Sequence, residues 1–136
     1  MTLVDAGPLI ALIDKGQGDL HRRCVEAHRK LPGPLITSWA CFTEAMHFLG
    51  GLGGWTAQAA LWRFLEENAL VIYAPNLQET LRIRTLMEQY RDVPMDLADA
   101  TLVALAETLA LKNVFTIDKD FYVYRINGKD GFEVVP

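Results

Sequence analysis

Cysteine is scarce in the sequence: only Cys24 and Cys41 occur among its 136 residues. They cannot form a disulfide framework, and together with the histidines they show no spacing typical of a zinc site. No apolar run approaches the roughly 20 residues that span a bilayer, and the N-terminal segment lacks the basic region of a signal peptide. We therefore expect reduced thiols, no membrane partner and a cytoplasmic location.

The sequence also lacks an excess of basic residues. It has 13 Lys and Arg against 17 Asp and Glu, and the net charge of -4 argues against a broad electrostatic clamp for nucleic acid. This balance leaves open an acidic, metal-filled active site at which a few arginines contact the substrate. With 51% hydrophobic and 22% charged residues, the chain can bury a core, which excludes intrinsic disorder. We expect one folded domain over residues 1–136.

Short apolar segments alternate along the chain with segments of helical periodicity. The pattern predicts strands at residues 2–5, 35–36, 70–74, 114–117 and 132–135, the third of them central. It predicts helices from Pro8 to Ile13, over residues 20–31, from a cap at Thr37 or Ser38 to Leu49, over 56–67, from a cap at Asn76 to Tyr90, and over 96–110. The glycine-rich segment 50–54 indicates a hinge or turn. Such alternation is typical of an α/β fold with a parallel sheet covered on both faces.

Four acidic residues stand out by their positions. Asp5 ends the first predicted strand, and Asp118 follows Ile117 at the end of another. Parallel sheets bind their ligands beyond the carboxyl ends of the strands. Asp99 and Glu44 lie on predicted helices among apolar neighbours, where an unpaired carboxylate is costly. A glutamate at a helix edge can also simply be solvated, so Glu44 has two readings.

The aspartates have ordinary structural explanations as well. Asp5 can cap the helix that follows it, and Asp96 and Asp99 suit the start of theirs. Asp118 and Asp120 fit an Asx turn at the end of a strand. Taken singly, each acid leaves both explanations open.

Taken together, the acids predict a metal site. Four carboxylates from distant parts of the chain would repel one another at one edge of a sheet and would be driven to bind protons. A divalent cation removes that cost, and an all-oxygen ligand set suits Mg²⁺ or Mn²⁺. Such ions activate water and stabilise the leaving oxygen of a phosphodiester.

Four motifs resemble those of the PIN-domain nucleases, and within them the VapC-type toxins of bacterial toxin–antitoxin pairs. They are LVDAGPLIAL at residues 3–12, TSWACFTE at 37–44, MDLADATLVALAE at 95–107 and FTIDKDF at 115–121. The third motif is the most specific. The order and spacing of the four match the family over nearly the whole chain.

The resemblance implies a three-layer α/β/α PIN-like domain with a mostly parallel sheet, and Mg²⁺- or Mn²⁺-dependent endonucleolytic cleavage of RNA. It assigns the catalytic and metal-binding roles to Asp5, Glu44, Asp99 and Asp118, with Asp96 and Asp120 as neighbours of second rank. We expect Asp5 and Asp99 to bind the principal Mg²⁺. Glu44 would complete its shell or orient the attacking water, and Asp118 would hold a second ion or a water.

The family also implies partners. These are an RNA substrate, a small cognate antitoxin that docks near the active site, and a second copy of the chain in a homodimer. The basic residues that could position the RNA backbone are Lys119, Arg22, Arg23, Arg82, Arg84, Arg91 and Arg125.

The chain departs from the family pattern at one place. Many members have Ser or Thr directly after the first acid, whereas this chain has Ala6 and Gly7. The main alternative function is a non-catalytic PIN-like module that binds RNA or protein, and the complete acidic set argues against it. A phosphate-accepting receiver domain would need its Asp after a central strand, but the strand predicted as central runs into Pro75 and Asn76.

Overall fold

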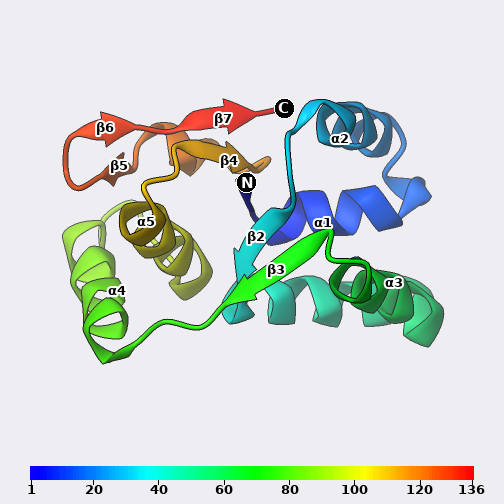
Figure 1. Ribbon diagram of the computed structural model, residues 1–136, viewed down its shortest axis with the longest axis horizontal. Coiled ribbons are helices and arrows are strands. Elements are labelled where there is room, and N and C mark those ends of the chain that lie inside the picture. Colours follow the sequence, from blue (N-terminus) through cyan, green and yellow to red (C-terminus); the bar gives the residue numbers. More distant parts are fainter.

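The computed structural model describes residues 1–136 and contains a five-stranded sheet in which all neighbouring strands are parallel (Figure 1). The strands are β1 (Thr2–Val4), β2 (Leu35–Ser38), β3 (Leu70–Tyr73), β4 (Asn113–Phe115) and β7 (Glu133–Val135). Their order across the sheet is β3-β2-β1-β4-β7. The prediction that the strand at residues 70–74 is central is therefore wrong, because β3 forms an edge and β1 the centre.

Helices cover both faces of the sheet. They are α1 (Ala6–Ile13), α2 (Asp19–Lys30), α3 (Trp39–Glu66), α4 (Leu77–Gln89) and α5 (Leu97–Leu109), with short 3₁₀ turns η1 (Lys15–Gln17) and η2 (Lys119–Tyr122). Leu3 of β1 packs in a core with α4 and α5, whereas the next residue, Val4, packs in a second core with α1, α2 and α3. This alternation produces the predicted three-layer α/β/α fold (Figure 1). No helix combines the length and the hydropathy that a membrane crossing needs.

Acidic side chains at the carboxyl edge of the sheet start two of the helices. Asp5 accepts a hydrogen bond from the backbone N–H of Ala6 (2.8 Å) at the start of α1, and Pro8 lies in the first turn, where it sacrifices no helical bond. Asp96 accepts one from the N–H of Asp99 (2.8 Å) at the start of α5. The capping role considered for Asp5 and Asp96 is therefore real, and it fixes both side chains at this edge.

The glycine-rich segment 50–54 confirms the predicted hinge or turn. The backbone of α3 leaves helical geometry at Gly54, where φ is 60° and ψ is -150°. The chain folds back there, because the rings of Phe42 and Trp62 lie 5.2 Å apart and Gln58 Nε2 donates to the carbonyl oxygen of Met46 (3.3 Å). Glycine adopts such a positive φ without the steric cost that a β-carbon would bring. The two helices predicted at 38–49 and 56–67 are thus present as two arms of α3, which pack against each other across the hinge at Gly54.

A short hairpin near the C-terminus was not predicted. β5 (Arg125–Ile126) pairs antiparallel with β6 (Asp130–Gly131), and Asn127 and Gly128 both have positive φ in the turn between them. An Asn-Gly pair favours such turns, so Asn127 and Gly128 are a sequence feature from which this hairpin can be predicted. β4 also ends earlier than expected, at Phe115, which leaves Ile117 in a loop.

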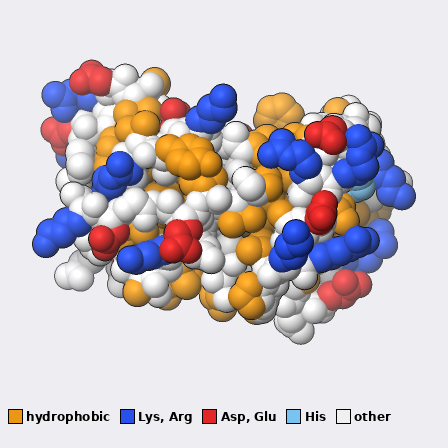
Figure 2. Space-filling view, turned by 90° about the horizontal axis from the view of Figure 1, so that it is seen from above, with side chains coloured by type: hydrophobic (Ala, Val, Ile, Leu, Met, Phe, Trp, Pro, Cys, Tyr) orange, Lys and Arg blue, Asp and Glu red, His pale blue; other side chains and the backbone are white.

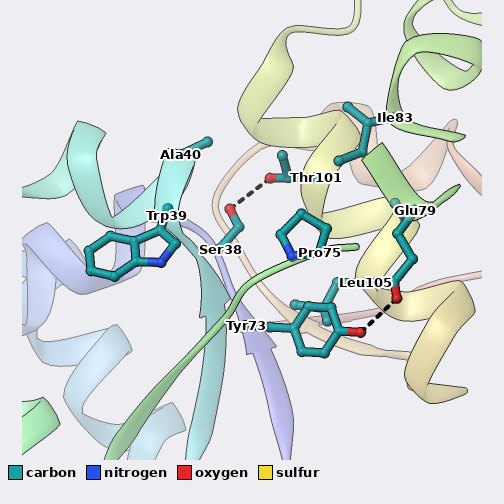
Figure 3. A pocket seen from close by; sticks show the side chains of 10 residues that line it. Ser38, Trp39, Ala40, Tyr73, Pro75, Glu79, Ile83, Thr101 and Leu105 are labelled. Carbon is teal, nitrogen blue, oxygen red and sulfur yellow. Dashed lines mark hydrogen bonds between the residues drawn. The ribbon is translucent and has the colours of Figure 1, made fainter. Parts of the chain in front are cut away.

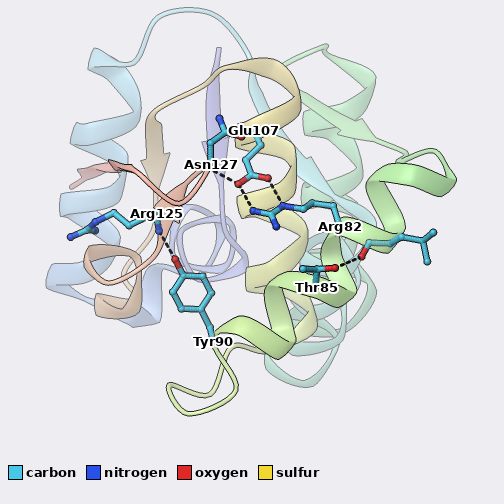
Figure 4. Close-up of polar contacts among 7 residues, drawn as sticks. Arg82, Thr85, Tyr90, Glu107, Arg125 and Asn127 are labelled. Atoms are coloured by element: carbon cyan, nitrogen blue, oxygen red, sulfur yellow. Dashed lines mark hydrogen bonds and ion pairs between the residues drawn. The ribbon is translucent and has the colours of Figure 1, made fainter.

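Glu107 on α5 connects α4 to this hairpin (Figure 4). Its carboxylate accepts hydrogen bonds from Arg82 Nε (2.8 Å) and Nη2 (3.1 Å) and from the backbone N–H of Asn127 (2.7 Å). The Tyr90 hydroxyl of the α4 C-cap accepts another from the backbone N–H of Arg125 (3.0 Å). These bonds hold α4, α5 and the hairpin together.

Glu107→Ala is expected to lower the free energy of unfolding by about 2–3 kcal/mol, because the Arg82 guanidinium and the Asn127 N–H would lose their shared acceptor at a largely buried position. Glu88→Ala is the matched control. Glu88 also pairs with an arginine, Arg84 (2.7 Å), but both side chains are exposed, and such pairs contribute below about 1 kcal/mol. Urea denaturation measures both variants, and equal losses would contradict the connecting role of Glu107.

Candidate metal-binding active site

Asp5, Asp99 and Asp118 meet at the carboxyl edge of the sheet. Each offers one carboxylate oxygen, and these oxygens lie within 4.8 Å of one another. Asp5 directly follows β1, Asp99 lies in the first turn of α5, and Asp118 lies in the loop between β4 and η2. β1 and β4 are parallel neighbours, so their carboxyl ends bring Asp5 and Asp118 to the same place. The structure thus brings together three of the four acids that the sequence singles out.

Both oxygens of Asp5 are held by hydrogen bonds. Asp5 is only 8% exposed; Oδ1 accepts from the N–H of Ala6 (2.8 Å) and Oδ2 from the Thr116 hydroxyl (2.9 Å). The Thr116 hydroxyl in turn accepts from the N–H of Asp118 (3.0 Å). Many family members have a hydroxyl directly after the first acid, where this chain has Ala6 and Gly7. Here Thr116, which follows β4, supplies a hydroxyl to Asp5 instead. Thr116 lies in the fourth motif, but nothing in the sequence pattern marks it as a partner of Asp5.

Asp99 is held by a buried tyrosine. It is 5% exposed, and its Oδ2 accepts a hydrogen bond from the hydroxyl of Tyr124 (2.8 Å). The Tyr124 ring packs edge-to-face against Tyr90 and Phe121, with ring centroids 5.2 and 5.1 Å apart. This packing fixes the direction of the hydroxyl. Tyr124 cannot be predicted as a functional residue from the sequence, because no spacing rule connects it with Asp99.

The site is electrostatically costly without a cation. Burial raises the pKa of Asp99 to about 7, although the hydrogen bond from Tyr124 opposes the rise. The charges of nearby acids, Asp96 first, raise it further. Burial likewise raises the pKa of Asp5 against the effect of its bond from Thr116. A bound cation would offset the repulsion and the lost solvation of both carboxylates.

The other predicted acids lie around this cluster and not within it. Glu44 lies on α3 and its side chain is exposed overall. Partial desolvation, and then the charge of Asp5, raise its pKa, so Glu44 lies within electrostatic reach of the cluster. Asp96 is exposed and caps α5. The backbone N–H of Asp120 donates to Asp118 Oδ1 (2.9 Å), and its carboxylate is not one of the three that converge. The metal-binding role of Glu44 stays a prediction.

Cys41 lies against the cluster but does not suit it as a ligand. It is fully buried, and its Sγ lies 3.7 Å from Asp5 Oδ1 and 3.7 Å from the carbonyl oxygen of Ala98. Burial, and then the charge of Asp5, raise the pKa of the Cys41 thiol, so it stays protonated. The remaining donors are all carboxylate oxygens, which fit a hard cation such as Mg²⁺ or Mn²⁺.

A cavity of about 120 Å³ lies beside the site, between β2, β3, α4 and α5 (Figure 3). Ser38 Oγ and Thr101 Oγ1 lie 2.7 Å apart at its lining, and the Tyr73 hydroxyl donates to Glu79 (2.9 Å). None of the converging acids lines this cavity. It is therefore separate from the candidate metal site.

The fold and the acid cluster define a small α/β domain with a candidate metal site. A family model described as PIN domain matches residues 2–127, and the chain belongs to that family. The position of β3 does not exclude a receiver domain, because β3 is an edge strand and not the central one. Membership of the PIN domain family excludes the receiver domain instead. A comparison with curated protein sequences finds no match.

Three solved structures share the fold. VapC20 of Mycobacterium tuberculosis, described as a sarcin-ricin loop cleaving toxin, is 18% identical over 100% of both chains, with a TM-score of 0.83. A toxin-antitoxin complex from Klebsiella pneumoniae is 23% identical over 89% of this chain and 90% of that chain, with a TM-score of 0.68. VapBC2 from Rickettsia felis, bound to a promoter DNA fragment, is 15% identical over 99% and 98%, with a TM-score of 0.66.

The metal-free protein is expected to lose stability as the pH rises. The pKa of Asp99 is about 7 in the folded chain against an ordinary 3.8, so between these values the folded chain holds a proton that the unfolded chain has released. Stability therefore falls with rising pH in this window, and Asp5, whose pKa is also raised, acts in the same direction. In EDTA we expect Tm to drop by roughly 5–10 °C between about pH 5 and pH 8.

Asp99→Asn should remove much of this drop, because an amide cannot lose the proton at issue. Asp130→Asn, an exposed aspartate in β6, is the control and should keep the parent's profile. Thermal unfolding followed by circular dichroism measures all three proteins. An Asp99→Asn profile as steep as that of the parent would show that the drop has another origin.

Proposed function

We propose that the protein is a Mg²⁺-dependent endoribonuclease and the toxin of a toxin–antitoxin pair. The observation that carries this proposal is the convergence of Asp5, Asp99 and Asp118 at the carboxyl edge of the sheet, in a chain of the PIN domain family. Asp5 and Asp99 are buried, and buried carboxylates whose oxygens lie within 4.8 Å of one another are costly unless a cation lies between them. Mn²⁺ would serve in the same ligand set.

Asp5, Asp99 and Asp118 would hold the ion. When bound, it would neutralise these acids, lower the pKa of a water and stabilise the charge that develops on the scissile phosphate. Tyr124 occupies Oδ2 of Asp99, and Oδ1 accepts no hydrogen bond from the chain, so Tyr124 determines which oxygen is left for the ion. Thr116 and a backbone N–H orient the two oxygens of Asp5.

Glu44 would orient the attacking water. Its side chain is exposed next to the cluster, and burial and then the charge of Asp5 raise its pKa. A carboxylate with a raised pKa accepts a proton more readily at neutral pH. Asp120 would act through its backbone N–H, which holds the carboxylate of Asp118.

We further infer an RNA substrate, a cognate antitoxin and a homodimer in the cytoplasm. The family resemblance implies these partners. The names of the structural neighbours support the RNA substrate and the antitoxin, since one is a toxin that cleaves the sarcin-ricin loop and the other two are toxin–antitoxin assemblies.

Asp99→Asn is expected to lower the rate of RNA cleavage in Mg²⁺ by at least about 100-fold, because it removes a charged oxygen ligand from the cluster. EDTA should stop cleavage by the unmodified protein. The measurement is gel analysis of a labelled structured RNA over time. Asp130→Asn, far along the chain in β6, is the control and should cut at the parent's rate.

The assay separates the proposal from its alternative. An Asp99→Asn protein that folds and cuts RNA as fast as the parent contradicts the assigned site. A parent protein that binds RNA but never cuts it, with Mg²⁺ or Mn²⁺ present, would instead establish the non-catalytic PIN-like module.

Asp118 and Asp120 can be distinguished in the same assay. Asp118→Asn is expected to lower kcat/KM about 100-fold, and Asp120→Asn less than about tenfold. The reason is that Asp118 contributes a carboxylate oxygen to the cluster, whereas Asp120 contributes a backbone N–H that its variant keeps. The opposite order of the two losses would assign the fourth acid to Asp120.

A further inference from the structure

Two adjoining hollows form a groove between α2 and the end of β7, called here the α2 groove. The first, of about 320 Å³, is lined by Asp118, Lys119, Tyr122 and Arg23 among others. The second, of about 490 Å³, shares Arg23 and extends past Lys30. Lys and Arg side chains gather over α2, at the right of Figure 2, with hydrophobic side chains beside them. Because Asp118 lines the first hollow, the groove begins at the acid cluster.

Two cations at the start of this groove have no partner in the protein. Arg23 and Lys119 are exposed, and neither makes an ion pair or a side-chain hydrogen bond. Arg22, the neighbour of Arg23 on α2, points elsewhere: it lines a different hollow and pairs with Asp19 (3.3 Å). Arg23 and Lys119 are thus unpaired cations that lie in the same hollow as Asp118 of the candidate active site.

An aromatic ring completes this part of the groove. Tyr122 lies in η2 and is 61% exposed, and Ile117 next to it along the lining is 46% exposed. Exposed rings next to unpaired cations are the two elements that single-stranded nucleic acid uses, since bases stack on the ring and phosphates pair with the charge. A hydrophobic protein segment would gain nothing from the two unpaired charges.

We propose that the α2 groove binds the RNA strand on one side of the scissile phosphate. Arg23 and Lys119 contact its phosphates, and Tyr122 stacks on a base. This inference rests on the proposed function, because it requires RNA to be the substrate. The groove defines the path of the strand: the groove runs from Asp118 along α2 toward Lys30.

The test measures binding of a short fluorescein-labelled single-stranded RNA of mixed sequence by fluorescence anisotropy, with Mg²⁺, in the Asp99→Asn background at several salt concentrations. Arg23→Ala and Lys119→Ala should each weaken binding about three- to tenfold. Each should also flatten the slope of log K against log salt by about 0.7, the value for one lost phosphate contact on a single strand. Arg22→Ala is the control and should change neither quantity by a comparable amount. Thermal unfolding confirms that each variant is folded.

Each outcome decides the matter. Loss of affinity and a smaller salt slope with Arg23→Ala and Lys119→Ala, but not with Arg22→Ala, supports the α2 groove as the RNA path. Unchanged binding by Arg23→Ala, or equal effects of Arg22→Ala and Arg23→Ala, overturns it and leaves the groove to a protein partner. No binding of RNA by the parent background overturns the proposed function itself, and the inference with it.

Discussion

Repulsion between Asp5, Asp99 and Asp118 is the constraint on which the rest of the structure depends. The parallel pairing of β1 with β4, which aligns Val4 with Phe115, makes the first and last of these acids neighbours. The register of the sheet also buries Asp5, where its charge loses solvent. A fold selected for stability alone would place an apolar residue there, so the acids mark a position where stability is given up, and the proposed cation accounts for that cost.

The surrounding structure fixes these acids without neutralising them. Thr116 and Tyr124 donate hydrogen bonds to one oxygen of Asp5 and of Asp99, and their hydroxyls are uncharged. Tyr124 can do so because its segment is tied to α4 and α5 through Glu107 and Tyr90. Helix capping also fixes an acid, because the hydrogen bond from the Ala6 N–H to Asp5 both caps α1 and orients the Asp5 carboxylate. The structural and the functional explanations of an acid are therefore not exclusive: a cap that holds a carboxylate still is what a metal ligand requires.

Local patterns in the sequence are enough to predict the layers, most element bounds and the positions of Asp5 and Asp118, because a strand and the residue that follows it are local information. The order of strands in a sheet does not follow from local patterns, and so the prediction that β3 is central is wrong. The bonds of Thr116 and Tyr124 to the acids join residues 111 and 25 positions apart, and they follow only from that order. The distance of Glu44 from the cluster depends in the same way on how α3 packs beside α5.

A net charge of -4 is compatible with an anionic substrate because charge acts locally. Exposed charges separated by more than the Debye length, about 8 Å at physiological ionic strength, scarcely influence one another. Several acids are already paired with basic neighbours, namely Asp19, Glu26, Glu88 and Glu107. Those at the candidate site would be neutralised by the proposed cation. An RNA strand in the proposed α2 groove would therefore meet the unpaired charges of Arg23 and Lys119. The charge of the whole chain argues against a broad basic clamp but not against a narrow basic path.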